Sequence, residues 1–529
     1  MMQRISNVRW MQLALVALIA LAALLYAANM LFGTLNQDEG WYLYAALSSH
    51  QGQMPYRDFF FTQGPVLPVV YGWLVPLWSS FGVAGGRVLT AILGMIGGVL
   101  VTLLAMCAVA RERRFTAALL AFAFIAANVY HSYFTVIPKT YALAAVLLLA
   151  GYLALVASAR AGRVWLAVLA GLLLATAAGT RLSLGALLAV TGFWLLAQQK
   201  LLPMRWFWFG IGGAAGLALV YGPALVLAPE QWRFANSFHV GREGGGLLFI
   251  AGSIARCIRG YLPLWLFGVA VAVWQIWLSR DADMTGETKS APRWPQLWLL
   301  SFAAVFAVHL LSPYPYDDYQ VPVMPLLAAV VAVAAARMVA LEKHGALVCV
   351  VATAALLAAV SSPINQDWFM IRQDRFWVVK RAPSDLAKLQ QTGKWIRENS
   401  PADKPLLTQD TYLAVEAQRR VPAGFEMGPF GYFPALDDAT AARLHVLNHA
   451  GLLRALRESD ASMAAFSGYG LAIGAPSMKE LSREDQQELW QTLAEQYDRI
   501  RVVPDFGQGA TTLTIWSRRI APPPLASNL

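Results

Sequence analysis

The sequence predicts an α-helical polytopic membrane protein with a separate α/β domain after its last membrane span. Of its 529 residues, 57% are hydrophobic and only 14% are charged, whereas soluble domains carry about 25% charged residues. Apolar runs of roughly 17–25 residues, long enough to cross a bilayer as helices, recur as far as residue 361. The remainder of the chain is charged and contains no such run. We therefore expect a membrane domain at residues 1–361 and an extracytoplasmic α/β domain at residues 362–529.

Basic residues beside the apolar runs predict the orientation of the chain. Arg4 and Arg9 precede the first run, and a Lys/Arg excess marks the cytoplasmic side of a span. Applied along the chain, this rule predicts about eleven spans, a cytoplasmic N-terminus and a C-terminal domain outside the cytoplasmic (inner) membrane. The predicted spans are residues 10–32, 88–110, 115–133, 139–159, 164–180, 182–199, 206–228, 247–278, 295–312, 321–340 and 345–361.

Residues 65–82 are apolar, but three prolines interrupt them. The next apolar run, 88–110, ends at the basic cluster 111–114, which the same charge rule places in the cytoplasm. Run 88–110 then crosses inward, so residues 65–82 cannot form a full span as well. We expect interfacial helices there, at the outer membrane surface.

The C-terminal part alternates helix-like and strand-like segments, which is typical of a small α/β domain. The helix-like stretches are residues 384–399, 438–457 and 482–497. The strand-like runs are residues 405–409, 464–472, 499–503 and 511–516.

Charge and cysteine usage exclude several function classes. The net charge of +10 falls largely in short loops between spans, as membrane topology requires, so we expect no nucleic-acid partner. The three cysteines have no CxxC spacing and lie in or beside apolar runs. Disulfides and a cysteine-bound metal are therefore not expected.

The first predicted outer loop, residues 33–64, holds charged side chains against the membrane. It contains Asp38, Glu39, Arg57 and Asp58 among aromatic residues and glycines. Carboxylates and arginines next to lipid are costly, so they indicate a functional site. A solvated tether between spans is the competing interpretation, but such a tether would not need the aromatic residues.

Other predicted outer loops carry polar groups to the same side of the membrane. Lys139 and Arg181 lie at span ends, where snorkelling to the interface is the competing explanation. His309 ends an apolar run and is expected to pack or hydrogen-bond. Arg256 and Arg259 lie about one helical turn apart in the first part of run 247–278, which suggests an interfacial start. The remaining outer-loop candidates are His131, Arg233, His239, Arg242, Glu243, Tyr316, Asp317, Asp318 and Tyr319.

This set of residues suits group transfer from an anionic, lipid-linked donor. A carboxylate can remove a proton from the acceptor as a general base. Cations can stabilise the charge that builds on a departing phosphate. Aromatic side chains suit the apolar face of a sugar ring and an isoprenoid chain.

The first outer loop resembles a known group of membrane enzymes. Asp38-Glu39 is followed by Trp-Tyr-x-Tyr-Ala-Ala, then by Gly-x-x-Pro-Tyr-Arg-Asp-Phe and Gly-Pro. This series is similar to the GT-C superfamily of membrane glycosyltransferases, in the branch of protein O-mannosyltransferases and lipid A aminoarabinose transferases. The resemblance covers roughly the first 110 residues and, more loosely, region 312–328. The lysine that aminoarabinose transferases carry near the end of this loop is Gln63 here.

The resemblance implies an inverting glycosyltransferase that takes a hexosyl or pentosyl group from a polyprenyl-phosphate donor at the outer membrane face. It implies that Asp38 is the catalytic base and that Glu39 occupies the neighbouring acidic position. Arg57 matches the basic contact to the donor phosphate best. A second cation is expected from Arg181, Arg256 or Arg259, and the sequence does not choose among them. The expected donor and acceptor pocket contains Tyr42, Tyr56, Tyr316, Asp317 and Tyr319.

The expected partners are the polyprenyl-phosphate sugar donor, membrane lipids and a glycan, lipid or protein acceptor. No cofactor or obligatory metal is expected, although Mg²⁺ or Mn²⁺ at the acid pairs Asp38–Glu39 or Asp317–Asp318 is an alternative. Two other functions compete. A polyprenyl-linked glycan ligase or polymerase would use the same donors, and a lipid-linked sugar transporter would have a similar number of spans but repeated halves.

Overall fold

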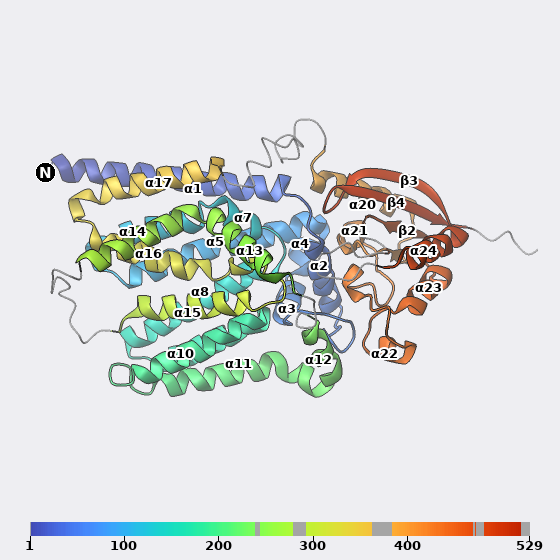
Figure 1. The fold of residues 1–529 in the computed structure, drawn as a ribbon, viewed down its shortest axis with the longest axis horizontal. Helices are drawn as coiled ribbons and strands as arrows, with labels where there is room; N and C mark the ends of the chain where they lie inside the picture. Colours follow the sequence, from blue (N-terminus) through green and yellow to red (C-terminus); the bar gives the residue numbers. More distant parts are fainter. Residues whose placement is uncertain are drawn as a thin grey trace, which may run out of the picture.

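The structure of the chain is a computed structural model that describes residues 2–238, 244–278, 292–361, 383–468, 471 and 481–519. Long helices run side by side, and the strands gather beyond one end of this bundle (Figure 1). The predicted domain boundary lies at the edge of residues 362–382, which are outside the described ranges. The chain thus has the two structural parts that the sequence predicts.

Helices occur in every range predicted to span the membrane. The bundle helices are α1 (Met2–Phe32), α5 (Gly82–Cys107), α6 (Arg114–Ile125), α7 (Val129–Phe134), α8 (Thr140–Ala161), α9 (Trp165–Thr180), α10 (Ala186–Ala197), α11 (Arg205–Leu227), α13 (Gly246–Gly260), α14 (Leu262–Leu278), α15 (Trp294–Leu310), α16 (Met324–Met338) and α17 (His344–Ser361). A short helix, α12 (Pro229–Ser237), follows α11. The range predicted as one span at 247–278 is two helices bent by 89°.

Several of these helices are long and apolar enough to cross a membrane. Within the described residues there are five, or six if the bent pair α13–α14 counts as one span, and four more apolar helices have 10–17 residues. The chain is therefore a multi-pass membrane protein. The number of about eleven spans stays a prediction.

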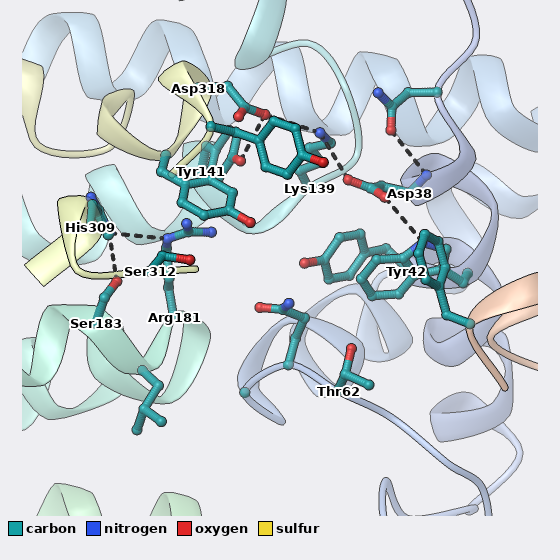
Figure 2. Close-up of a pocket in the computed structure, with 18 of the residues that line it drawn as sticks. Asp38, Tyr42, Thr62, Lys139, Tyr141, Arg181, Ser183, His309, Ser312 and Asp318 are labelled. Carbon is teal, nitrogen blue, oxygen red and sulfur yellow. Dashed lines mark hydrogen bonds and ion pairs between the residues drawn. The ribbon is translucent and has the colours of Figure 1, made fainter. Parts of the chain in front are cut away.

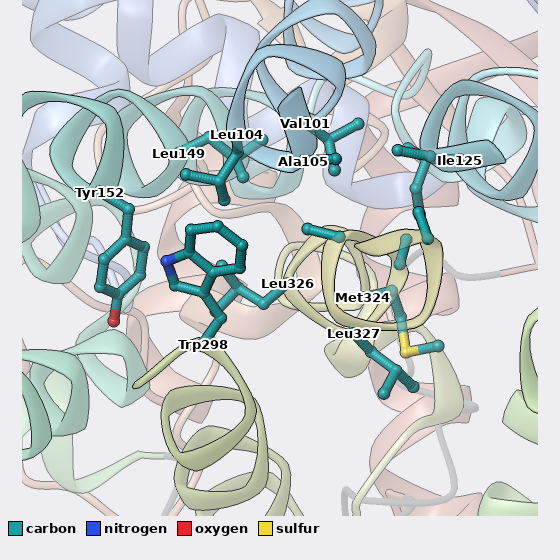
Figure 3. Close-up of a cluster of buried hydrophobic side chains, with 14 of the residues drawn as sticks. Val101, Leu104, Ala105, Ile125, Leu149, Tyr152, Trp298, Met324, Leu326 and Leu327 are labelled. Atoms are coloured by element: carbon teal, nitrogen blue, oxygen red, sulfur yellow. The ribbon is translucent and has the colours of Figure 1, made fainter. Parts of the chain in front are cut away.

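The centre of the bundle is a continuous apolar core with a few internally satisfied polar groups. Trp298 is fully buried among leucines and small residues of neighbouring helices (Figure 3). The hydroxyl of Tyr152 donates to Ser301 Oγ at 2.6 Å. At the contact of α9 and α11, a Cβ on Gly171 would lie 2.1 Å from the carbonyl oxygen of Phe209. Glycine there allows the close backbone approach that is typical of membrane helices.

The first predicted outer loop, residues 33–64, and the apolar stretch 65–82 that follows it, from here on together called the first loop, fold into short helices between the bundle and the C-terminal part. They are α2 (Gln37–His50), α3 (Val66–Trp73) and α4 (Val75–Trp78), followed by the 3-10 turn Ser79–Phe81. Residues 65–82 therefore form short, broken helices and not one continuous helix, as their prolines predict.

The C-terminal part is a small α/β domain, as predicted. Its four strands, β1 (Leu406–Leu407), β2 (Met463–Phe466), β3 (Tyr497–Phe506) and β4 (Thr511–Arg518), lie in the order β1-β2-β4-β3. β1 and β2 are parallel and the other pairs are antiparallel. Its helices are α20 (Asp385–Asn399), α21 (Thr411–Ala417), α22 (Asp438–Arg443), α23 (His449–Glu458) and α24 (Arg483–Gln496).

Two details of this domain differ from the prediction or fall outside the described residues. The stretch 438–457 was expected to be one helix but is two, because the side chain of Asn448 accepts from Gly451 N at 2.7 Å and so caps a new helix. The strand-like run 464–472 forms β2 at its start. Residues 469, 470 and 472 of that run lie outside the described residues.

The first loop and the C-terminal domain share one hydrophobic core. Trp41 and Tyr71 from the loop belong to the same buried cluster as Leu413 and Phe425 from the domain. Most buried side chains of the bundle helices form a different cluster. The loop is thus packed as part of the C-terminal domain, and α2 lies at the junction between that domain and the bundle (Figure 1).

Candidate functional site

The first turn of α2 positions Asp38 through a capping box. The Asn36 side chain accepts from the backbone N–H of Asp38 at 3.0 Å, and Glu39 Oε1 accepts from the backbone N–H of Asn36 at 3.0 Å. Together these bonds satisfy two amides at the start of the helix. The Asn-x-x-Glu pattern was a sequence signal for this helix start that our sequence analysis did not use.

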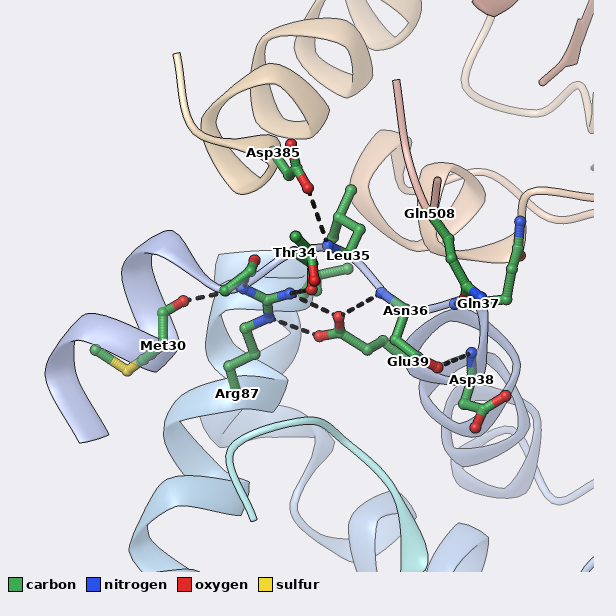
Figure 4. A network of polar contacts seen from close by, with 12 residues as sticks. Met30, Thr34, Leu35, Asn36, Gln37, Asp38, Glu39, Arg87, Asp385 and Gln508 are labelled. Carbon is green, nitrogen blue, oxygen red and sulfur yellow. Dashed lines mark hydrogen bonds and ion pairs between the residues drawn. The ribbon is translucent and has the colours of Figure 1, made fainter. Parts of the chain in front are cut away.

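The two adjacent acids point to different places (Figure 4). Glu39 is fully buried and receives two hydrogen bonds of 2.6 Å from Arg87 on α5. Arg87 also donates to the backbone oxygens of Gly33 at 2.9 Å and Thr34 at 3.1 Å. Glu39 therefore anchors the loop to the bundle, and it is not among the pocket-lining residues.

Asp38 instead faces a pocket at the junction (Figure 2). Trp41 Nε1 donates to Asp38 Oδ1 at 3.2 Å, and Lys139 Nζ lies 2.8 Å from Asp38 Oδ2. The same Nζ lies 3.3 Å from Asp318 Oδ2, which also accepts from the Tyr141 hydroxyl at 2.9 Å. Lys139 thus bridges two carboxylates from distant parts of the chain. A lysine that only snorkels to the membrane interface would place its ammonium in water and would not make these contacts.

The pocket has a volume of about 580 Å³ and is built from three parts of the chain. The first loop contributes Asn36, Gln37, Asp38, Trp41, Tyr42, Thr62 and Gln63. The bundle and its late loop contribute Phe134, Lys139, Tyr141, Arg181, Ser183, His309, Tyr316, Asp317, Asp318 and Tyr319. The C-terminal domain contributes Met427, Phe430 and Gln508. A concave site in which aromatic rings and charged or polar side chains converge is typical of small-molecule binding.

Arg181 lies across the pocket from Asp38 (Figure 2). Its guanidinium carbon is 4.5 Å from the Tyr319 ring centroid and 5.1 Å from that of Tyr141. Its Nε lies 3.4 Å from His309 Nε2. None of the carboxylates that the structure describes forms an ion pair with Arg181. Its charge is therefore oriented by aromatic rings and is available to an anionic ligand.

Several predicted site residues come together in this pocket. Besides Asp38 and Arg181, the lining includes Tyr42, Tyr316, Asp317 and Tyr319. Asp317 accepts from Arg256 Nε at 3.0 Å and from the Tyr130 hydroxyl. As expected, His309 is hydrogen-bonded, to Ser183 Oγ at 2.7 Å and Gln320 Oε1 at 3.1 Å.

Other predicted residues lie elsewhere. Arg57 is exposed and pairs with its neighbour Asp58 at 2.7 Å. Arg259 is exposed on α13, and neither arginine is among the pocket-lining residues. Tyr56 is buried within the loop, and its hydroxyl donates to the carbonyl of Gln63, which does line the pocket.

The C-terminal domain also contributes to the site, although its sequence did not predict this. Gln508 accepts from the backbone N–H of Gln37, at the start of α2, at 2.8 Å. Gln37 also donates to the buried carboxylate of Asp410 at 3.1 Å. Burial raises the pKa of Asp410, while hydrogen bonds from Ser467 and Tyr412 lower it. No local sequence signal marks these contacts, because they join residues more than 370 positions apart.

By structure, the chain is similar to known membrane glycosyltransferases. No protein-family model matches the chain, and no curated protein matches its sequence. The crystal structure of ArnT from Cupriavidus metallidurans bound to undecaprenyl phosphate is similar with a TM-score of 0.58 and 14% identity, over 95% of this chain and 97% of that one. ArnT in the apo state is similar with a TM-score of 0.55, 15% identity and the same coverage.

A more distant similarity is to the apo oligosaccharyltransferase from Archaeoglobus fulgidus, with a TM-score of 0.46 and 14% identity over 85% of this chain and 69% of that one. The similarity to ArnT, a lipid A aminoarabinose transferase, extends over nearly the whole of both chains. The chain therefore shares the fold of ArnT, as the resemblance implied, with an α/β domain at its C-terminal end.

Proposed function

We propose that this protein is an inverting glycosyltransferase that moves a sugar from a polyprenyl-phosphate donor to an acceptor at the outer face of the cytoplasmic membrane. The proposal rests on one observation: the carboxylate of Asp38 and the guanidinium of Arg181 face each other across the same pocket (Figure 2). Asp38 is 28% exposed at its side chain, and Arg181 faces it without a carboxylate partner among the described residues. The fold similarity to ArnT bound to undecaprenyl phosphate supports the same donor class.

The chemistry follows from these positions. Asp38 removes the proton of an acceptor hydroxyl or amine as that oxygen or nitrogen attacks the anomeric carbon of the sugar. The bond from this carbon to the phosphate oxygen breaks on the opposite face, and the phosphate leaves with the electron pair. Arg181 stabilises its negative charge. A single displacement with one base inverts the anomeric centre, because no covalent glycosyl intermediate forms.

The pocket also suits the two substrates physically. Aromatic rings of Trp41, Tyr42 and Phe430 offer apolar faces for sugar rings at the side of Asp38. Tyr141 and Tyr319 place hydroxyl groups and rings around Arg181, where the phosphate would bind. The acceptor is a glycan, a lipid or a protein, and the C-terminal domain is placed to contact it beside the pocket.

The test is sugar transfer by purified protein, wild type beside Asp38→Asn, with radiolabelled polyprenyl-phosphate sugars and cell-envelope extract as acceptor. We expect the transfer rate of the variant to fall on the order of 10²–10⁴-fold, while donor binding and thermal stability persist. Full activity in Asp38→Asn would contradict the role of this carboxylate. If wild type binds the donor lipid but transfers no sugar to any acceptor, a lipid-linked sugar transporter becomes the better interpretation.

A further inference from the structure

The buried ammonium group of Lys139 lies between two carboxylates of the pocket, those of Asp38 and Asp318. Lys139 Nζ is 2.8 Å from Asp38 Oδ2 and 3.3 Å from Asp318 Oδ2, and the lysine side chain is only 8% exposed. Its Nζ also lies 5.6 Å from the ring centroid of Tyr141 and 5.9 Å from that of Phe134. The ammonium is thus held from several sides, and the lysine has little room to swing away (Figure 2).

The adjacent acid pairs that suggest a divalent cation in the sequence do not converge. Glu39 turns away from Asp38 to Arg87, which supplies both of its short hydrogen bonds. Asp317 turns away from Asp318 to Arg256. The acids that do converge are Asp38 and Asp318, which are 280 positions apart, and the position between them is filled by Lys139. These residues therefore do not fit a Mg²⁺ or Mn²⁺ ion at the pocket while Lys139 is in place.

Lys139 neutralises half of the carboxylate charge at this position. The carboxylates of Asp38 and Asp318 each lie within 4 Å of Lys139 Nζ. Without this ammonium between them, the two negative charges would repel each other strongly in a half-buried site. Lys139 supplies one positive charge and up to three donors, of which the two carboxylates take two. Removing the lysine would leave two oxygen-rich groups facing a cavity, which is the ligand type that hard divalent cations prefer.

We propose that Lys139 is a built-in replacement for a bridging divalent cation: it positions the Asp38 carboxylate against the late loop, so that transfer needs no added metal. The part of this inference that concerns sugar transfer rests on the proposed function. The part that concerns cation binding can be tested without it. Lys139 acts through Asp38 and is a positioning residue. It also links the start of α2 to the 3-10 turn Asp317–Gln320, and so joins two walls of the pocket.

The test compares wild type with Lys139→Gln and Lys139→Arg by two measurements, Mn²⁺ binding followed by electron paramagnetic resonance and sugar transfer with and without EDTA. We expect wild type and Lys139→Arg to bind no Mn²⁺ in the pocket and to keep their activity in EDTA. We expect Lys139→Gln to bind Mn²⁺ and to lose transfer on the order of 10–100-fold. Millimolar Mn²⁺ or Mg²⁺ should restore part of that loss.

A matched control removes the second carboxylate. Mn²⁺ binding to Lys139→Gln should disappear when Asp318→Asn is added. The inference is overturned if EDTA abolishes wild-type transfer and Mn²⁺ or Mg²⁺ restores it, or if wild type binds Mn²⁺ and Asp318→Asn removes that binding. It is also overturned if folded Lys139→Gln neither binds nor responds to either cation. If wild type transfers no sugar at all, the proposed function fails, while the Mn²⁺ measurements still decide the role of Lys139.

Discussion

Glu39 and Arg87 form a two-point ion pair, with two hydrogen bonds of 2.6 Å each and side chains that are 0% and 1% exposed. Arg87 also donates to the carbonyls of Met30 at 3.1 Å and Gly33 at 2.9 Å. One arginine on α5 therefore ties the end of α1 to the start of α2. This contact fixes the loop that carries Asp38.

Glu39→Gln should destabilise the protein strongly. Removing one partner of a buried ion pair leaves an uncompensated charge and costs about 3–5 kcal/mol. We expect a clear fall in the thermal unfolding temperature in detergent, and a loss of transfer that follows the loss of folded protein. Asp38→Asn, one residue away, should leave the unfolding temperature nearly unchanged. Equal effects of the two variants on unfolding would contradict the separation of their roles.

Arg181→Gln should weaken donor binding. A charge-assisted hydrogen bond to a phosphate contributes about 1.5–3 kcal/mol, so the dissociation constant for polyprenyl phosphate should rise about 10–100-fold. Arg181→Lys should recover only part of the affinity, because an ammonium does not stack on Tyr141 and Tyr319 as a planar guanidinium does. Binding of fluorescent polyprenyl phosphate to purified protein measures this directly.

Arg57→Gln is the matched control for Arg181. Arg57 is exposed and lies outside the pocket, so its substitution should leave both donor affinity and the unfolding temperature unchanged. If Arg57→Gln weakens donor binding more than Arg181→Gln does, the phosphate lies in the first loop and not beside the late loop.

Glu426 should make the stability of the protein depend on pH. Burial raises its pKa from 4.5 to about 7, so between these values the folded state holds a proton that the unfolded state has lost. Stability contributed by the neutral acid is complete below about pH 4.5, falls as the pH rises towards 7 and changes little above it. The unfolding temperature of wild type should therefore drop across this window. Glu426→Gln should reduce that drop.

The control for this pH effect is an exposed carboxylate of the same domain. Glu398 on α20 is 59% exposed and pairs with Lys394 at 3.8 Å. Glu398→Gln should keep the wild-type dependence of the unfolding temperature on pH. A Glu426→Gln profile identical to wild type would show that other buried acids of the domain cause the slope.

Gly40→Ala should disturb the contact between the first loop and the C-terminal domain. A Cβ at this position would lie 2.2 Å from the backbone nitrogen of Tyr412 and 2.5 Å from Thr411 Oγ1. Such overpacking costs about 1–3 kcal/mol or more, which should lower the unfolding temperature. Gly97→Ala on α5 is the control, because a Cβ there meets no atom within 4 Å. That variant should be neutral or slightly stabilising, and an equal loss in both variants would contradict the tight contact.

The sequence alone was sufficient for the fold class and for the position of the central loop. Lipid requires helices with satisfied backbone groups, so run length and composition reveal the apolar helices directly. The change from apolar runs to charged, alternating segments likewise predicted the C-terminal α/β domain. Charge is costly beside a membrane, so Asp38 stood out before any geometry was known.

The roles of individual charged residues were decided only by the tertiary structure. Asp38 and Glu39 are neighbours in sequence, but successive residues on a helix point about 100° apart, so one faces the pocket and the other the bundle. In the sequence, Arg181 directly follows an apolar run and Arg259 lies within one, and nothing local distinguishes their roles. Packing brings the first into the pocket and leaves the second exposed.

The same holds for the residues that surround Asp38 in the site. Lys139, Asp318 and Gln508 come from three distant parts of the chain, and none has a local pattern that marks it. The first loop also packs into the core of the C-terminal domain, although the sequence groups it with the membrane helices. Composition and periodicity determine which segments are buried in lipid, because those signals are local. Which charges face one another depends on long-range packing, and only the three-dimensional structure contains that information.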